Sequence, residues 1–241
     1  MGRKTAVIIG VGPGLGMSMA RRFGDEGFRV AVLSRSGTRH AAYLADLAER
    51  GIEASAHAVD VTDGVRLGAV LADIQRAGDI ELLYYGPGAT QQPRPIAEID
   101  AASVRASFDW VLPAVDAVRV VLPGMLERGS GALLFAGGLS SVRPMPMLGQ
   151  LALAGAALRN YALTLNAGLA ERGIYAGTLT IGGLVERGDI HAMIAADPDR
   201  FGGAAGHTLD PDDLAEAAWR MYRDRDRAEE VFDVLGDAEV R

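Results

Sequence analysis

The chain alternates short, continuously apolar segments with longer segments in which apolar residues recur at helical spacing. The short segments predict strands over 5–9, 28–33, 52–59, 80–85, 132–136 and 175–181, and a closing edge strand over 231–235. Helices are predicted between them, including 41–50, 104–127 and 149–171. Because the strands show no two-residue periodicity, both faces of the sheet must be covered. We therefore predict an α/β fold with one doubly wound parallel sheet and helices on both of its faces.

The composition predicts a single domain and excludes several classes of function. A chain of 241 residues fits one domain over 1–241. The net charge of −7 argues against nucleic acid as a partner, and no apolar run approaches the roughly 18 residues of a membrane span. The absence of cysteine excludes disulfides and thiol catalysis, and the 4 scattered histidines indicate no metal site. We expect a cytoplasmic protein.

The first strand and the first helix are joined by a loop in which glycine takes every second position, at Gly10, Gly12, Gly14 and Gly16. The spacing of Gly10, Gly14 and Gly16 fits G-x-x-x-G-x-G and does not fit G-x-G-x-x-G. Glycines at such a turn let the backbone approach a pyrophosphate, which the N-terminus of the next helix then holds. We interpret the loop as the dinucleotide site of a Rossmann-type domain. A tight turn without a ligand is the alternative.

The end of the second strand indicates which dinucleotide is preferred. An NAD site needs a carboxylate here to accept a hydrogen bond from the ribose 2′-hydroxyl, and the segment Leu33-Ser34-Arg35-Ser36 has none. Arg35 provides a planar cation suited to a 2′-phosphate, and Ser34 removes the repulsive acid. We predict that NADP(H) is favoured over NAD(H). The alternative is a solvated surface arginine.

These features resemble the short-chain dehydrogenase/reductase family, and the resemblance runs over nearly the whole chain. The glycine motif matches, and Asp60-Val61 matches the family's adenine-contacting pair. Leu122-Pro123-Gly124-Met125 matches its Leu-Pro-x-Met run before strand five. Of the family's Asn-Asn-Ala-Gly turn only the last glycine is kept, at Gly88, and Gly182-Gly183 stands where the family has Pro-Gly.

The resemblance implies a cofactor site, a substrate lid near 184–208 and a homodimer or homotetramer. The subunits are expected to pack through 104–127 and 149–171, whose small apolar faces include Ala154, Ala157, Leu158 and Leu165. The residues expected to contact the cofactor lie in the loops that follow the strands: Gly10, Gly12, Gly14, Leu15, Gly16, Ser34, Arg35, Asp60, Val61, Gly86, Gly88, Gly183 and Val185.

The family's catalytic residues are missing from the matching positions. Its Asn falls on Trp110 and its Ser on Gly138, while its Tyr-x-x-x-Lys falls on Leu151 and Gly155. Leucine and glycine can neither transfer a proton nor orient a carbonyl. Another alignment does not help, because no Tyr-x-x-x-Lys occurs and Lys4 is the only lysine. Trp110 either stacks on a flat ligand or fills the vacated volume.

Other groups near the predicted site are candidate substitutes. Ser140 and Ser141 follow strand five, and Tyr85 ends strand four, although serines in such a loop are also ordinary. The segment 185–191 carries acids, an arginine and an imidazole, which suits either acid–base work or a solvated loop.

Three functions remain open for this chain. The first is an atypical NADP(H)-dependent oxidoreductase acting on a small carbonyl or alcohol substrate. The second is a catalytically dead relative that binds nucleotides or regulates a partner, and the third is a non-redox lyase or isomerase. General acid–base catalysis is worth about 10²- to 10⁴-fold, so its loss does not forbid hydride transfer by positioning alone. We rank the oxidoreductase first.

Overall fold

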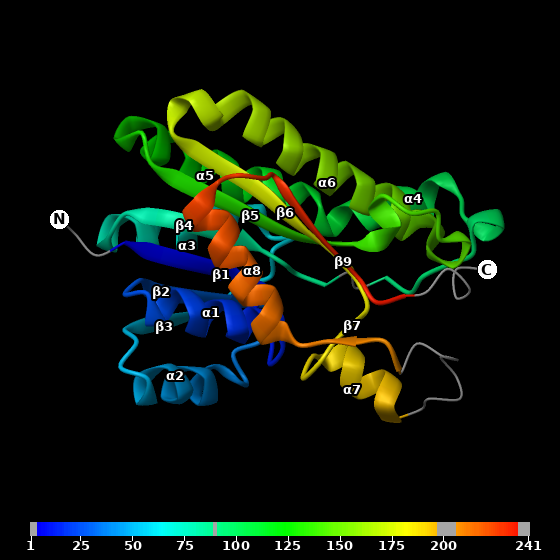
Figure 1. Ribbon diagram of the computed structural model, residues 1–241, viewed down its shortest axis with the longest axis horizontal. Coiled ribbons are helices and arrows are strands. Elements are labelled where there is room, and N and C mark those ends of the chain that lie inside the picture. The colour runs from blue at the N-terminus through cyan, green and yellow to red at the C-terminus, as the bar shows by residue number, and fades with distance from the viewer. Residues whose placement is uncertain (1–3, 89–90, 197–205, 236–241) are drawn as a thin grey trace.

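The strands form one parallel sheet that runs through the middle of the molecule (Figure 1). The computed structural model describes residues 4–88, 91–196 and 206–235. Within these ranges, seven strands pair in the order β3-β2-β1-β4-β5-β6-β9. They are β1 (Thr5–Ile9), β2 (Arg29–Ser34), β3 (Ala54–Ala58), β4 (Ile80–Tyr85), β5 (Gly131–Gly138), β6 (Ile174–Gly182) and β9 (Glu229–Asp233). This arrangement confirms the predicted fold class.

Helices cover both faces of the sheet. Successive side chains of each strand point to opposite faces, so the apolar side chains on both faces need cover. Ala6 and Ile8 of β1 are fully buried on one face, and Val7 and Ile9 are fully buried on the other. The first face carries α1 (Leu15–Asp25), α2 (His40–Glu49) and α8 (Pro211–Asp224). The second carries α3 (Gly64–Ala77), α5 (Leu112–Arg128) and α6 (Gly149–Leu169), and α4 (Ala101–Ser107) packs against α6. Burial on both faces explains why the inner strands are mainly apolar, whereas the edge strands β3 and β9 are partly exposed and carry polar residues.

The single helix predicted over 104–127 is wrong. The segment forms two helices, α4 and α5, with a 3₁₀ turn at Phe108–Trp110 between them. Pro113 lies in the first turn of α5, where its missing N–H is tolerated. Inside a continuous helix its ring would clash with the carbonyl four residues earlier. The break brings Trp110 to the carboxyl edge of the sheet.

Two further details differ from the sequence predictions. Ala154 and Leu158, expected at subunit contacts, are buried against the chain's own sheet, because they lie four residues apart on the inner face of α6. The closing edge strand begins two residues earlier than predicted, at Glu229, and pairs in parallel with β6. A second, two-stranded sheet joins β7 (Leu184–Val185) to β8 (Thr208–Leu209), close to α7 (Asp189–Ala196).

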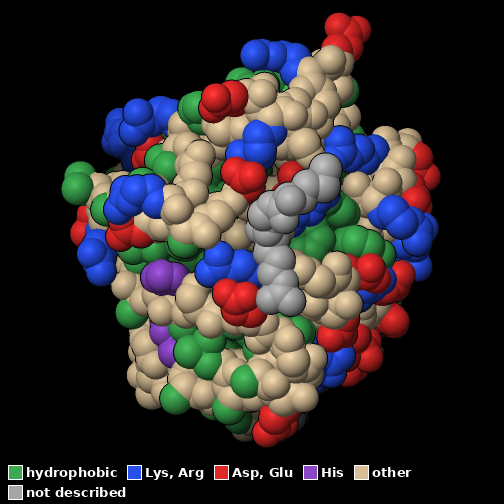
Figure 2. Space-filling model, turned by 90° about the vertical axis from the view of Figure 1, so that its left-hand side faces the viewer, with side chains coloured by type: hydrophobic (Ala, Val, Ile, Leu, Met, Phe, Trp, Pro, Cys, Tyr) green, Lys and Arg blue, Asp and Glu red, His purple; other side chains and the backbone are tan. Residues whose placement is uncertain are grey.

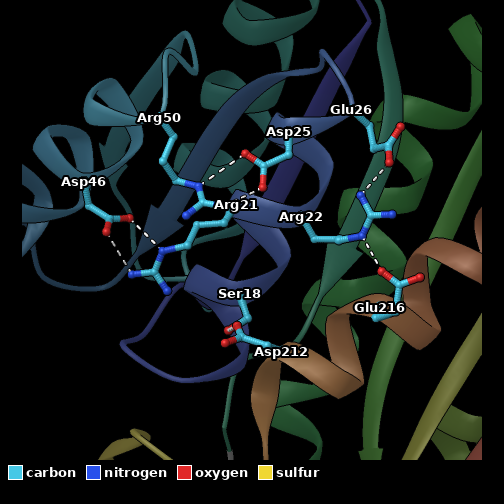
Figure 3. Close-up of polar contacts among 9 residues, drawn as sticks. All are labelled: Ser18, Arg21, Arg22, Asp25, Glu26, Asp46, Arg50, Asp212 and Glu216. Atoms are coloured by element: carbon cyan, nitrogen blue, oxygen red, sulfur yellow. Dashed lines mark hydrogen bonds and ion pairs between the residues drawn. The ribbon is translucent and has the colours of Figure 1, made fainter.

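Charged side chains of both signs are interspersed on the face at the amino ends of the strands (Figure 2). On the first face of the sheet, paired charges join α1 to its neighbours (Figure 3). Arg21 pairs with Asp46 of α2, and Arg22 pairs with Glu216 of α8, with N···O distances of 2.8 and 2.6 Å. Among the helices of the described ranges, none is both long and apolar enough to cross a membrane.

Candidate active site

A cavity of about 480 Å³ opens at the carboxyl ends of β1, β4, β5 and β6. It extends from the glycine loop to the positions where the resemblance places the catalytic residues. Nine of the thirteen predicted cofactor residues line it: Gly10, Gly12, Gly14, Leu15, Gly16, Gly86, Gly88, Gly183 and Val185. Residues that sequence reasoning did not select also line it, including Leu148 and Ile181. One cavity therefore joins the two halves of the predicted site.

The glycine loop leaves room for a ligand beside the start of α1. Gly10 has φ +89°, and a Cβ on it would lie 2.5 Å from the backbone nitrogen of Pro87, so the turn itself requires glycine. Around Gly12, by contrast, a Cβ would meet no atom within 4 Å. α1 begins directly after Gly14 and has no acidic residue in its first turn. No acidic side chain of the helix therefore weakens the attraction of its positive end for an anion such as a diphosphate.

The other four predicted cofactor residues lie outside the cavity, at the ends of β2 and β3. Ser34 Oγ lies 2.8 Å from Nε2 of His40 and donates a hydrogen bond to the carbonyl of Ser36. Arg35 is exposed. Hydrogen bonds from the amide and hydroxyl of Thr62 lower the pKa of Asp60, and the nearby charge of Arg35 lowers it further. These ends flank the glycine loop, because β2 pairs with β1.

Val61, the last of these four residues, is partly buried and packs against the core on the second face of the sheet. Its side chain therefore supports the loop that carries Asp60. An adenosine group placed beside Asp60 and Arg35 would lie on an open surface, next to the cavity and not inside it.

All four positions of the missing catalytic residues lie on the cavity: Trp110, Gly138, Leu151 and Gly155. Leu151 and Gly155 are one helical turn apart on the same face of α6. The indole Nε1 of Trp110 is buried and has no hydrogen-bond partner in the described structure. The four positions that the resemblance assigns to catalysis therefore lie together around one cavity, although their side chains lack proton chemistry.

The two candidate serines lie against two of these positions. Ser140 Oγ is 3.7 Å from the place where a Cβ on Gly138 would lie, and Ser140 itself lines the cavity. Ser141 Cβ is 3.8 Å from the corresponding place on Gly155. The Oγ of Ser141 is buried and has no partner within the described residues. The hydroxyl of Ser140 therefore lies close to the space beside Gly138, whereas Ser141 is not among the residues that line the cavity.

Tyr84, and not Tyr85, faces the cavity. Adjacent residues of a strand point to opposite faces, so only one of the pair can reach the site. The hydroxyl of Tyr85 donates a hydrogen bond to the carbonyl of Trp110 at 2.5 Å, inside the core. Burial raises the pKa of both tyrosines above the ordinary value of 10.0. This placement argues against proton transfer by Tyr85.

The charged side chains after β6 are held by structural partners. Glu186 accepts a hydrogen bond from Thr208 at 2.7 Å. Asp189 forms a two-bonded ion pair with Arg39, whose hydrogen bonds lower the pKa of Asp189. These contacts argue for a structural role over acid–base work. Part of the expected lid, 197–205, lies outside the described residues. Among the residues that the structure describes, no group of three or more His, Asp or Glu could hold a metal.

Comparisons with known proteins agree with this geometry. A provisionally named ketoacyl reductase of Streptomyces coelicolor is 31% identical over 137 residues, which is 54% of this chain and 51% of that protein. The rat inactive hydroxysteroid dehydrogenase-like protein 1 is 25% identical over 177 residues, or 72% of this chain and 54% of that protein. The matches thus span about half the length of these two relatives.

Structural similarity extends over nearly the whole chain. L-sorbose reductase of Gluconobacter frateurii, complexed with NADPH and L-sorbose, has a TM-score of 0.85 at 21% identity, over 99% of this chain and 98% of that one. At this identity the similarity establishes the fold. The short chain dehydrogenase family model matches residues 4–190 of the sequence. The chain therefore belongs to the short chain dehydrogenase family.

Proposed function

We propose that the chain is an NADP(H)-binding oxidoreductase that acts on a small carbonyl or alcohol without the family's usual catalytic residues. One observation carries the proposal: a single cavity runs from the glycine loop at the start of α1 to Ser140, Gly138 and Gly155. A bound nicotinamide dinucleotide would supply or accept the hydride there. The open space at Gly12 and the uncapped N-terminus of α1 fit its diphosphate.

The chain's own residues would bind and position the substrate but would deliver little acid–base catalysis. Ser140 can donate a hydrogen bond to a carbonyl oxygen near Gly138. Leu151 and Gly155 leave an apolar space in place of an acid and its cation, so the proton on the product oxygen would come from water. We expect slow turnover, because an absent general acid costs about 10²- to 10⁴-fold.

The preference for NADP(H) rests on Arg35 and on the absence of a carboxylate at Ser34. A guanidinium can bind a phosphate with two parallel hydrogen bonds. The exposed position of Arg35, beside Asp60, fits a phosphate on the adenosine ribose. The NADPH in the L-sorbose reductase structure is consistent with this preference but belongs to that protein.

Thermal shift with NADPH and, in parallel, NADH tests the proposal. A ligand at 100 times its Kd stabilises a protein by about 2.7 kcal/mol. For a domain of this size, that free energy raises Tm by roughly 5–11 °C. NADPH should give this shift, NADH much less, and Arg35→Ala should reduce the shift with NADPH alone. Arg223→Ala is the matched control, because Arg223 lies at the C-terminal end of α8, where it pairs with Asp224. No shift with either nucleotide would refute the proposal.

A catalytically inactive nucleotide-binding protein is the second candidate. Two observations favour it. The one carboxylate on the described lining of the cavity, Asp189, is paired with Arg39 and does not take the place of Leu151 or Gly155, and the rat relative carries the word inactive in its name. Absorbance at 340 nm separates the two functions. NADPH oxidation with any member of a carbonyl panel supports the enzyme, whereas NADPH binding without turnover across carbonyl and alcohol panels supports the binding protein.

A further inference from the structure

The segment between β7 and α7 lies directly on the glycine loop. A Cβ on Gly14 would be 2.9 Å from the carbonyl oxygen of Glu186 and 3.1 Å from the amide nitrogen of Gly188. Gly14 is the residue before the first turn of α1. In this conformation the segment 186–188 therefore covers the point where the glycine loop meets the helix that would hold a diphosphate.

Arg187 holds one side of this segment on α8. Its Nη2 lies 3.1 Å from Oδ1 of Asp210 and 2.8 Å from Oδ2 of Asp212, at the start of that helix. It also donates to Ser18 Oγ, which donates in turn to Asp212, as Figure 3 shows for the last pair. Arg187 has φ +63°, a left-handed conformation that is uncommon outside glycine. Several contacts thus hold the side of the segment next to β7.

On the other side of the segment, an exposed ion pair joins α7 to Arg39. Both Oδ atoms of Asp189, the first residue of α7, accept hydrogen bonds of 2.8 Å from Arg39. Arg39 is the residue directly before α2. It lies four residues after Arg35, which follows the last residue of β2. The side chains are 53% and 65% exposed for Arg39 and Asp189, so a ligand can reach the pair. The pair therefore links α7 to the loop after β2, which carries Arg35 and is proposed to bind the adenosine ribose.

We infer that Asp189 occupies, in the free chain, an anion site that Arg39 offers to the 2′-phosphate of NADP(H), so that binding of this phosphate releases α7. The inference rests on the proposed function. A guanidinium fork binds a carboxylate and a phosphate with the same two hydrogen bonds, so the two anions compete. A phosphate monoester carries a charge of about −1.5 to −2, compared with −1 for the carboxylate, so the guanidinium attracts the phosphate more strongly.

This arrangement makes Arg39 a second specificity-determining residue beside Arg35. NAD(H) has a hydroxyl in place of the phosphate and cannot displace Asp189. The 2′-phosphate would therefore both strengthen binding and free the helix next to the cavity, which Asp189 and Ile190 line. Release of α7 would leave the contacts of Arg187 in place, so the segment would turn about its β7 side.

Binding of 2′,5′-ADP and of 5′-AMP by the full-length chain tests the inference, because the two probes differ only in the 2′-phosphate. Asp189→Asn should bind 2′,5′-ADP about two- to five-fold tighter than the parent, the range expected for removal of a competing exposed ion pair. Arg39→Gln should bind it at least about five-fold more weakly. Neither variant should change the affinity for 5′-AMP.

Hydrogen–deuterium exchange over 184–196 gives a second readout that needs no cofactor. Both variants should exchange faster than the parent without nucleotide, and 2′,5′-ADP should accelerate exchange in the parent only. Arg50→Gln is the matched control, because it breaks a similar exposed pair with Asp25 (Figure 3) and should leave this segment unchanged. If Asp189→Asn changes neither the exchange nor the affinity for 2′,5′-ADP while NADPH binds normally, this inference is overturned and the proposed function stands. Absence of NADPH binding to the parent would instead refute the proposed function as well.

Discussion

At the scale of single residues, the four positions that the resemblance assigns to catalysis share one place in the fold, although their side chains carry no acid–base chemistry. The resemblance assigns those positions to Trp110, Gly138, Leu151 and Gly155, all of which line one cavity. It cannot place the hydroxyls of Ser140 and Ser141, because loop conformation decides where they lie. The alternation of a strand could have separated Tyr84 from Tyr85, but it does not tell which of them faces the ligand.

If the assignment of these positions is correct, restoring two side chains should restore catalysis. The double variant Leu151→Tyr/Gly155→Lys places an acid and a cation one turn apart on α6. A Cβ on Gly155 would lie 3.8 Å from Ser141 Cβ, an ordinary contact, so a longer side chain can start there. We expect NADPH-dependent turnover to rise by about 10²- to 10⁴-fold in a 340 nm assay.

The control for this experiment is Leu151→Phe/Gly155→Met, which adds similar volume without proton chemistry. Both variants must keep the thermal shift with NADPH, so that turnover is compared between proteins that bind the cofactor. A restored variant that binds NADPH and turns over no faster than the control would contradict the assignment of Leu151 and Gly155.

At the scale of elements, apolar runs predicted the strands to within about two residues at most ends, because burial on both faces leaves little choice of residue. The helix over 104–127 was predicted wrongly because its apolar spacing continues through the break. Pro113 was an available signal, since proline is favoured in the first turn of a helix, although Pro123 lies inside α5 without ending it. β7 and β8 are each 2 residues long and were not predicted, because so short a pairing leaves no periodicity.

Local capping, by contrast, can be tested at one helix end. The side chain of Asp63 accepts a hydrogen bond of 2.9 Å from the amide of Arg66 and caps α3. Asp63→Ala should lower the free energy of unfolding by about 0.5–2 kcal/mol, because the amide loses this acceptor. Urea denaturation at neutral pH measures the change. Asp63→Asn keeps an acceptor oxygen and should cost much less, so equal losses in the two variants would argue against capping.

At the scale of the whole molecule, ion pairs join elements that are far apart in the sequence. Arg39 and Asp189 are 150 residues apart, and Arg159 and Glu229 are 70 residues apart. Neither pair could be predicted from spacing, because only the folded sheet brings the partners together. The same holds for the oligomeric state, which stays a prediction. On the two long helices, Leu112, Val115 and Leu153 are the exposed large apolar side chains in the described residues.

The pair of Arg159 and Glu229 fastens the last strand to the rest of the molecule. Both oxygens of Glu229 accept hydrogen bonds from Arg159 of α6, at 2.7 and 2.5 Å, and Thr180 of β6 donates to one of them. Only 17% of the Glu229 side chain is exposed. The hydrogen bonds from Arg159 hold the pKa of Glu229 below its ordinary value of 4.5. The ionised carboxylate therefore stabilises the folded chain above about pH 4.5, and this contribution is lost as the pH falls through the lowered pKa.

Glu229→Gln should accordingly cost about 1–3 kcal/mol of unfolding free energy at pH 7, the usual size for hydrogen bonds to a charged group. The cost should shrink as the pH falls below about 4.5, because the parent carboxylate then becomes protonated as well. Urea denaturation of both proteins between pH 7 and pH 3 measures this convergence. Asp224→Asn, at an exposed pair with Arg223, should change stability little at any pH. A cost for Glu229→Gln that stays constant with pH would show that shape, and not charge, fastens the last strand.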